Sequence, residues 1–196
     1  MITVTETLQT DAPLIRLQVQ TTAYTPDWCV NLANGDKSNL DMDQPYQRGN
    51  IWNDQHRRLL IRSLMQGIPI GAITINDRFA AQFHEPSYGS RHSGTPNRNW
   101  AYAVVDGKQR FTTLVRWALS ELTVPASWFP RSDILSTEET LDGQYVRMSG
   151  LNPTQRRKFL NRPLAVVLAT VQTLIEEQQI FNLINFGGVA QGEGAI

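Results

Sequence analysis

The sequence has little cysteine, no excess of charge and no long apolar run, and each shortage excludes a class of protein. Cys29 is the single cysteine, which excludes a disulfide within the chain and a zinc site built from several cysteines. Lysine and arginine together number 18, as do aspartate and glutamate, so no net charge draws the whole chain to DNA. No apolar stretch approaches the roughly 18 residues of a membrane-spanning helix, and the N-terminus lacks the pattern of a signal peptide. We therefore expect a cytoplasmic protein.

Common catalytic motifs are also missing from the sequence. It contains no P-loop, no Gly-x-Gly-x-x-Gly run and no Gly-x-Ser-x-Gly elbow. His56, His84 and His92 do not have the spacing of metal ligands. Cys29 has no base close to it in the sequence, so we do not expect a thiol nucleophile.

The sequence has the pattern of a single domain that contains both helices and strands. Hydrophobic residues make up 41% of the chain, enough for one core, and we expect a single domain over residues 1–196. Strands are predicted at 14–19, 70–75, 100–105 and 164–170, and helices at 53–66, 108–122, 152–161 and 171–184. Residues 24–45 are expected to be a surface loop, 78–99 a polar insertion that forms a loop or lid, and 125–150 fit no pattern. The alternation predicts an α+β (mixed α/β) fold.

One junction concentrates residues that bind anions. A predicted strand ends at Asp106 and Gly107, and a helix begins with Lys108 and Arg110 in its first turn. Free N–H groups at a helix start bind phosphate, which the two cations would neutralise. Asp106 would hold a metal, orient water or accept a proton. Hydroxyl groups follow one turn later, at Thr112 and Thr113. The alternative is that Asp106 only caps the helix and the cations are solvated.

Two other clusters are polar in the same way. Tyr46-Gln47-Arg48, close to Trp52, places an arginine among aromatic rings, where it would stack on a base or clamp a phosphate. The alternative is that the two rings are core anchors and that Arg48 is a surface ion-pair partner, so this role stays open. Asn185 precedes the pair Gly187-Gly188, whose amide groups would contact a ligand or simply end a helix.

Taken in chain order, these three clusters resemble the motifs of a known family. Tyr46-Gln47-Arg48 with Trp52, the segment 63–70, and the run Val104-Val105-Asp106-Gly107-Lys108-Gln109-Arg110-Phe111-Thr112-Thr113-Leu114 resemble the N-terminal domain of GmrSD-type modification-dependent restriction proteins. The stretch from Phe181 through Asn185 to Gly188 is similar to a later segment of that family. The resemblance implies a ParB/sulfiredoxin-like nucleotide-binding domain with added helices, which hydrolyses or transfers phosphate from a nucleoside triphosphate in phage defence.

The resemblance implies that Asp106, Gly107, Gln109 and Arg110 form the nucleotide site, with Tyr46, Gln47 and Arg48 opposite, and the residue types extend this expectation. Asp106, Gln109 and Arg110 would be catalytic, with Mg²⁺ on Asp106 as an expected cofactor. The nucleotide would contact Tyr46, Gln47, Arg48, Gly107, Lys108, Thr112, Thr113, Asn185, Gly187 and Gly188. The chain departs from the family at Lys108, where the usual residue is glutamine. No His-Asn-His nuclease motif follows, so we do not expect the chain to cut DNA by that chemistry.

Alternative functions remain open at this point. The same pocket would serve a nucleotide-binding module without turnover. A ParB-like module would bind DNA through the basic cluster Arg156, Arg157, Lys158 and Arg162. The chain would also fit a homo-oligomeric interaction protein, or one that works with a separate nuclease.

Overall fold

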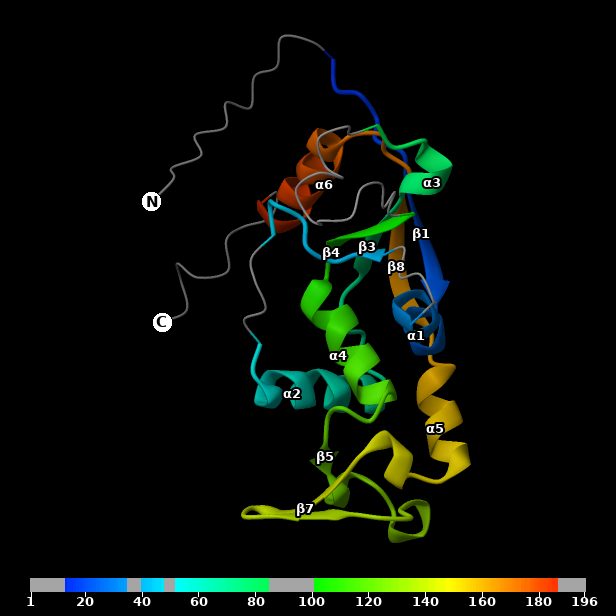
Figure 1. Cartoon of the computed structure of the whole chain (residues 1–196), viewed down its shortest axis with the longest axis vertical. Coiled ribbons are helices and arrows are strands. Elements are labelled where there is room, and N and C mark those ends of the chain that lie inside the picture. Colours follow the sequence, from blue (N-terminus) through cyan, green and yellow to red (C-terminus); the bar gives the residue numbers. More distant parts are fainter. Residues whose placement is uncertain (1–12, 35–39, 48–51, 85–100, 187–196) are drawn as a thin grey trace, which may run out of the picture.

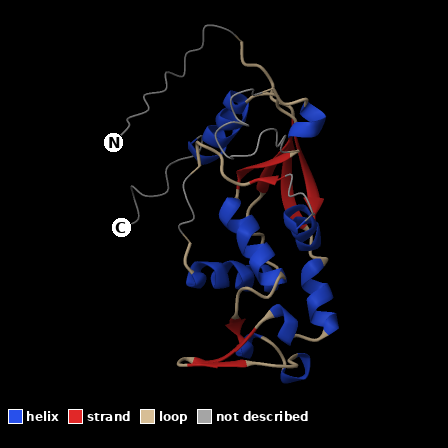
Figure 2. Ribbon diagram, in the orientation of Figure 1, coloured by secondary structure: helices blue, strands red, loops and turns tan. Residues whose placement is uncertain are grey.

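The computed structural model describes residues 13–34, 40–47, 52–84 and 101–186 (Figure 1). Within these ranges the chain forms a five-stranded sheet, a three-stranded sheet and six α-helices. Figure 2 shows the larger sheet among helices in the upper half of the view and the smaller sheet at the lower end of the long axis. The mixed α+β class predicted from the sequence is therefore confirmed.

The larger sheet mixes parallel and antiparallel pairs. Its strands are β1 (Val19–Tyr24), β2 (Leu40–Asp41), β3 (Ile73–Asp77), β4 (Tyr102–Asp106) and β8 (Leu164–Ala169), in the order β1-β8-β3-β4-β2. The β8–β3 and β4–β2 pairs are parallel, whereas β1–β8 and β3–β4 are antiparallel. The register of β3 on β4 shifts between Thr74 and Ile75. This order brings the end of β4 beside the segment that leads into β3.

Helices cover both faces of this sheet. They are α1 (Pro26–Asn34), α2 (Asp54–Met65), α3 (Arg78–Ala81), α4 (Lys108–Ala118), α5 (Pro153–Leu160) and α6 (Leu174–Phe186). Successive strand residues point to opposite faces, so Val104 belongs to the main core with Trp117 of α4. Val105 belongs to a second cluster with Ile180 of α6. The strand β4 therefore separates α4 from α6.

The smaller sheet extends the main core rather than forming its own. It consists of β5 (Val124–Pro125), β7 (Gly143–Val146) and β6 (Glu138–Thr140), with 3-10 turns at Ala126–Trp128, Arg131–Asp133 and Met148–Gly150. Val124 and Val146 are fully buried members of the main core. The guanidinium of Arg58 on α2 lies 4.7 Å from the centre of the Tyr145 ring. These contacts fix the smaller sheet to the helical layer.

Local capping signals located two helices correctly. The side chain of Asn53 accepts a hydrogen bond from the backbone of His56 at the start of α2, and Gly67 follows its end with φ +82°. Asn152 caps α5, whose first residue is Pro153. The predictions for helices starting near 53 and 152 are thus confirmed.

Other predictions were wrong in places. The first strand lies at 19–24 rather than 14–19, and the expected loop at 24–45 contains α1 and β2. The first residues of the expected polar insertion form α3, and Arg78 there is buried. Residues 85–100 of that insertion lie outside the described residues. The unassigned stretch 125–150 carries most of the smaller sheet. Among the described helices, none has the length and apolar character to cross a membrane.

Candidate functional site

The candidate site is the junction where β4 ends and α4 begins. Gly107 connects them in the left-handed conformation, with φ +85°. A Cβ at this position would lie 3.1 Å from Nη2 of Arg110 and 3.2 Å from Cα of Ile73. Glycine is therefore required both by its backbone angle and by the lack of space.

Arg110 folds back over this turn. Its Nη2 donates to Oδ2 of Asp106 at 2.7 Å and to the carbonyl of Ala72 at 2.8 Å. The guanidinium passes between Gly107 and Gly71, where a Cβ would lie 3.8 Å from it. Its Nε is buried and has no hydrogen-bond partner among the described residues. The two glycines thus form a slot that holds a cation at the helix start.

The start of α4 also differs from the other helix starts. Side-chain oxygens of Thr25, Asn53, Asp77, Asn152 and Thr173 accept hydrogen bonds from first-turn N–H groups of the other five helices. In the described part of the chain, no side chain caps α4. The positive end of the helix dipole therefore meets no side-chain oxygen cap from the described residues, and such an environment favours an anion.

The second cation of the junction has a counter-ion of its own. Nζ of Lys108 lies 2.5 Å from Oδ1 of Asp43, in the segment after β2. The Lys108 side chain is 18% exposed and that of Asp43 is 76% exposed. The structure therefore brings a residue to the site that the sequence had not singled out.

Helix α6 closes another side of the junction. Nδ2 of Asn185 donates to Oδ1 of Asp106 at 3.3 Å and to the carbonyl of Phe181 at 2.9 Å. The rings of Tyr46 and Phe181 lie 5.3 Å apart between centres, and the Tyr46 hydroxyl lies 3.4 Å from Oε2 of Glu177. The cluster around Tyr46 and the cluster around Asn185 thus both lie beside the Asp106 junction. Their positions in the sequence did not reveal this arrangement.

Gln47 has a structural role in this arrangement. Its Nε2 donates to the carbonyls of Val104 and Val105, the latter at 2.8 Å. These carbonyls follow the part of β4 that pairs with β2. The amide therefore continues the sheet edge up to Asp106, while its Oε1 has no partner in the described part of the chain.

The remaining expected site residues differ in position. Thr113 is fully buried and its hydroxyl donates to the carbonyl of Gln109 at 2.7 Å, within the helix. Thr112 and Gln109 are half-buried on the first turns of α4. The predicted residues Arg48, Gly187 and Gly188 lie outside the described residues.

This sequence matches a family model. The model is that of the GmrSD restriction endonuclease N-terminal domain, and it covers residues 30–192. The chain belongs to this family. The GmrSD N-terminal domain family is restriction-related, with a context of phage defence. The chain matches no curated protein and no solved structure.

A buried ionic cluster next to the site of this GmrSD-family domain was missed from the sequence. The guanidinium of Arg78 donates to both carboxylate oxygens of Glu177, at 2.7 and 2.6 Å, and to Asp41 at 2.9 Å. Gln44 and Asn76 complete it, accepting from Arg78 at 3.0 Å and donating to Glu177 at 2.8 Å. These five residues come from β2, β3, α3, α6 and the segment after β2. No local pattern signals the cluster, since it joins three segments, 41–44, 76–78 and residue 177, that are far apart in the chain.

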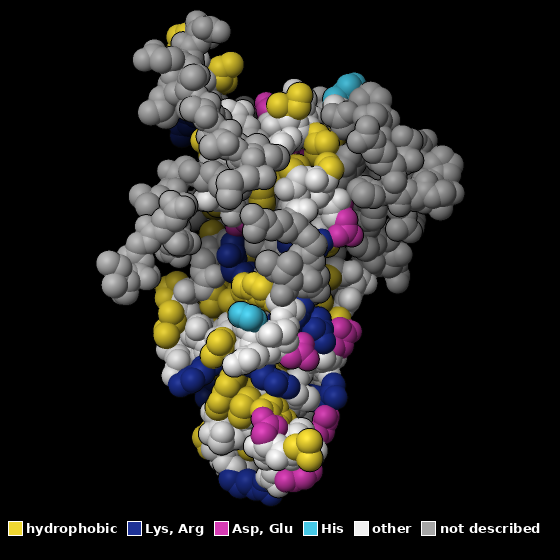
Figure 3. All heavy atoms as spheres, turned by 90° about the vertical axis from the view of Figure 1, so that its left-hand side faces the viewer, with side chains coloured by type: hydrophobic (Ala, Val, Ile, Leu, Met, Phe, Trp, Pro, Cys, Tyr) yellow, Lys and Arg dark blue, Asp and Glu magenta, His cyan; other side chains and the backbone are white. Residues whose placement is uncertain are grey.

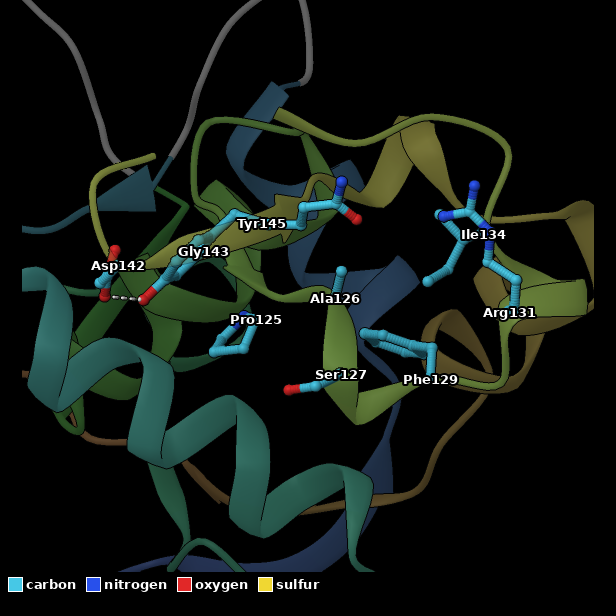
Figure 4. Close-up of a pocket in the computed structure, with 10 residues that line it drawn as sticks. Pro125, Ala126, Ser127, Phe129, Arg131, Ile134, Asp142, Gly143 and Tyr145 are labelled. Atoms are coloured by element: carbon cyan, nitrogen blue, oxygen red, sulfur yellow. Dashed lines mark hydrogen bonds between the residues drawn. The ribbon is translucent and has the colours of Figure 1, made fainter. Parts of the chain in front are cut away.

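A hollow of about 470 Å³ lies against the smaller sheet, at the end of the molecule that carries β5 and β7 and away from β4 (Figure 1). Figure 4 shows Pro125 and Phe129 on one side of it, Tyr145 across from Pro125, and Arg131 beside Phe129 at one end. The Tyr145 hydroxyl donates to Asp142 at 2.6 Å. This bond raises the pKa of Tyr145 and lowers that of the Asp142 carboxyl. It stabilises the turn between β6 and β7.

The basic cluster predicted at Arg156, Arg157, Lys158 and Arg162 lies on α5 and just after it, apart from the junction. Arg157 and Lys158 are exposed on α5, whereas Arg156 and Arg162 are half-buried. None of the ion pairs among the described residues includes them. By contrast, Figure 3 shows cations interspersed with acids on the face that carries α2. The surface of α5 is thus locally basic in a chain without net charge.

Proposed function

We propose that this domain binds a nucleotide through its phosphates at the start of α4 and hydrolyses it. The observation that carries the proposal is a helix start with no side-chain cap, two cations and a glycine turn that permits close approach. Such a turn lets backbone N–H groups reach phosphate oxygens directly, as in other phosphate sites. The family's likeness to ParB and sulfiredoxin domains is part of the same proposal.

Each residue of the junction has a distinct proposed role. Lys108 and Arg110 would neutralise phosphate charge, and Arg110 is already oriented by its two hydrogen bonds. Asp106 lies beside the phosphate position, where it would orient the attacking water and accept its proton. Gln109, half-buried in the same turn, would help to orient that water.

The base or sugar would lie toward α6. Asn185 is exposed and donates its amide N–H to Asp106, so it would contact a ligand bound beside that carboxylate. The tilted pair of Tyr46 and Phe181 forms the neighbouring wall. An amide beside an aromatic wall recognises a flat polar group such as a nucleobase.

Magnesium would be held mostly by the ligand. The described residues contain no group of three or more His, Cys, Asp or Glu side chains that could hold a metal ion. Both oxygens of Asp106 already accept hydrogen bonds, from Arg110 and Asn185. Asp106 would be the carboxylate that holds Mg²⁺ beside the bound phosphates, where the ion would neutralise phosphate charge.

The test compares two arginines of the same helix. Arg110→Ala should weaken nucleotide binding by about 10- to 100-fold, since a hydrogen bond to a charged group contributes about 1.5–3 kcal/mol. Arg116→Ala removes a cation from the last turn of α4, where it pairs with Asp54 at 3.3 Å, and should leave binding unchanged. Each nucleoside triphosphate is added with Mg²⁺, and thermal shift and product are both measured. Equal binding by the two variants would refute the site.

Hydrolysis is tested separately from binding. Asp106→Asn keeps the shape of the side chain and should retain binding while product formation stops. If Asp106→Asn forms product as fast as the parent, the assigned role of Asp106 is wrong. A thermal shift in the parent without product would favour a module that binds a nucleotide without turnover.

A second candidate function is DNA binding through α5. The observation that favours it is the exposed pair Arg157 and Lys158 on a helix that contains no acidic residue. Adjacent cations without internal counter-ions are suited to the phosphates of a duplex. A separate nuclease, or a second copy of the chain, remains the expected protein partner.

A further inference from the structure

The ion pair between Lys108 and Asp43 places a carboxylate at the mouth of the proposed phosphate site. Lys108 is the first residue of α4, and its Nζ lies 2.5 Å from Oδ1 of Asp43. A phosphate bound at the helix start would use this same ammonium group. Asp43 therefore occupies a position that an incoming phosphate oxygen requires.

The position of Asp43 is set by the buried ionic cluster. Its backbone N–H donates to Oδ1 of Asp41 at 3.1 Å. The other oxygen of Asp41, which is only 3% exposed, accepts from Arg78 at 2.9 Å. The side chain of Gln44 donates to the Asp41 carbonyl at 3.2 Å. The buried side chains of Asp41, Gln44 and Arg78 thus hold the turn at residues 41–44 in place. In this position the Asp43 carboxylate contacts Lys108.

The two counter-ions of the junction differ in how easily they can leave. Asp106 is 16% exposed and is paired with Arg110, which is itself held by the Ala72 carbonyl. Asp43 is 76% exposed, so water can replace Lys108 around it at little cost. An incoming anion would displace Asp43 first and leave the inner pair intact.

We propose that Asp43 is a displaceable counter-ion that sets the affinity of this site for polyphosphates. This proposal rests on the proposed phosphate site. Before ligand binds, Asp43 neutralises Lys108 and keeps the uncapped helix start from holding weakly charged anions. A polyphosphate supplies enough charge to take Lys108 from Asp43, which then returns to water. Asp43 thereby lowers affinity in exchange for selectivity against weakly charged anions.

The test is a double-mutant cycle on the full chain. The variants are Asp43→Asn, Lys108→Gln and their combination, and the ligand is inorganic tripolyphosphate, titrated calorimetrically without Mg²⁺. Asp43→Asn should tighten binding about two- to fivefold, the range of an exposed ion pair. In the Lys108→Gln background the same change should alter Kd by less than about 1.5-fold, because the competition is gone.

A matched control separates competition from net charge. Asp54→Asn removes the same charge from an exposed carboxylate that pairs with Arg116 at the other end of α4, and it should leave Kd unchanged. An equal gain from Asp43→Asn in both backgrounds, or none in either, would overturn the proposal. Binding that is lost in Arg110→Ala but insensitive to Asp43 would keep the phosphate site and reject the counter-ion. Failure of every variant and of the parent to bind would reject both.

Discussion

Removal of the Arg78 guanidinium should be among the most destabilising single changes in this domain. The Arg78 side chain is 2% exposed and that of Glu177 is fully buried, with Asp41 at 3%. Arg78→Met keeps much of the apolar stem but leaves two buried carboxylates without their shared cation. Breaking a buried ion pair in this way costs about 3–5 kcal/mol, because the remaining charge is neither hydrated nor paired.

Urea denaturation, followed by tryptophan fluorescence and far-UV circular dichroism, measures this cost. With a slope of about 2 kcal/mol per M, the midpoint for Arg78→Met should fall by about 1.5–2.5 M. The matched control is Arg116→Met, which breaks an ion pair whose side chains are 30% and 52% exposed. That change should cost less than about 1 kcal/mol. If Arg78→Met lowers the midpoint no more than Arg116→Met, the cluster does not stabilise the fold as argued.

Three further predictions concern the glycine turn, the cysteine and the basic helix. Gly107→Ala should weaken triphosphate binding because its methyl group would meet the ion-paired guanidinium at 3.1 Å. Gly67→Ala, at a similar φ but with only an ordinary contact of 3.8 Å to the Arg162 side chain, should cost stability alone, and thermal shift with and without ligand separates the two. Burial raises the pKa of the Cys29 thiol from 9.0 to about 12, so the free energy of unfolding should fall as pH rises from 9 toward 12, and the loss should be smaller in Cys29→Ala. Removing both Arg157 and Lys158 should reduce the slope of log K for duplex DNA against log salt by about 2, and an unchanged slope would exclude α5 as the contact.

Much of the helical structure was predictable because its signals are local. The cap at Asn53, the apolar spacing of α2 and the glycine after its end lie within one short segment. The turn at Gly107 was also predictable, since a strand end followed by Asp-Gly and a cationic helix start is a continuous pattern. Capping and dihedral preferences act over a few residues, so a single sequence contains them.

The segments that were predicted wrongly depend on distant partners. Residues 24–45 are polar enough to suggest a loop, yet α1 forms there because Pro26 and Cys29 are buried against the core. The first strand lies at 19–24 because its register is set by pairing with β8, about 145 residues further along the chain. Local composition carries no information about either contact.

The sequence alone determined the family and the mixed class, and it named Asp106, Arg110 and Asn185, which the structure brings into contact. Only the tertiary structure decided that Asp43 pairs with Lys108 and that Arg78 joins Asp41 to Glu177, which are 37 and 99 residues away from it. A charged side chain finds its partner through strand order and helix packing, and both depend on the whole chain. The physical reason is that burial makes an unpaired charge costly, so the completed fold selects which charges meet.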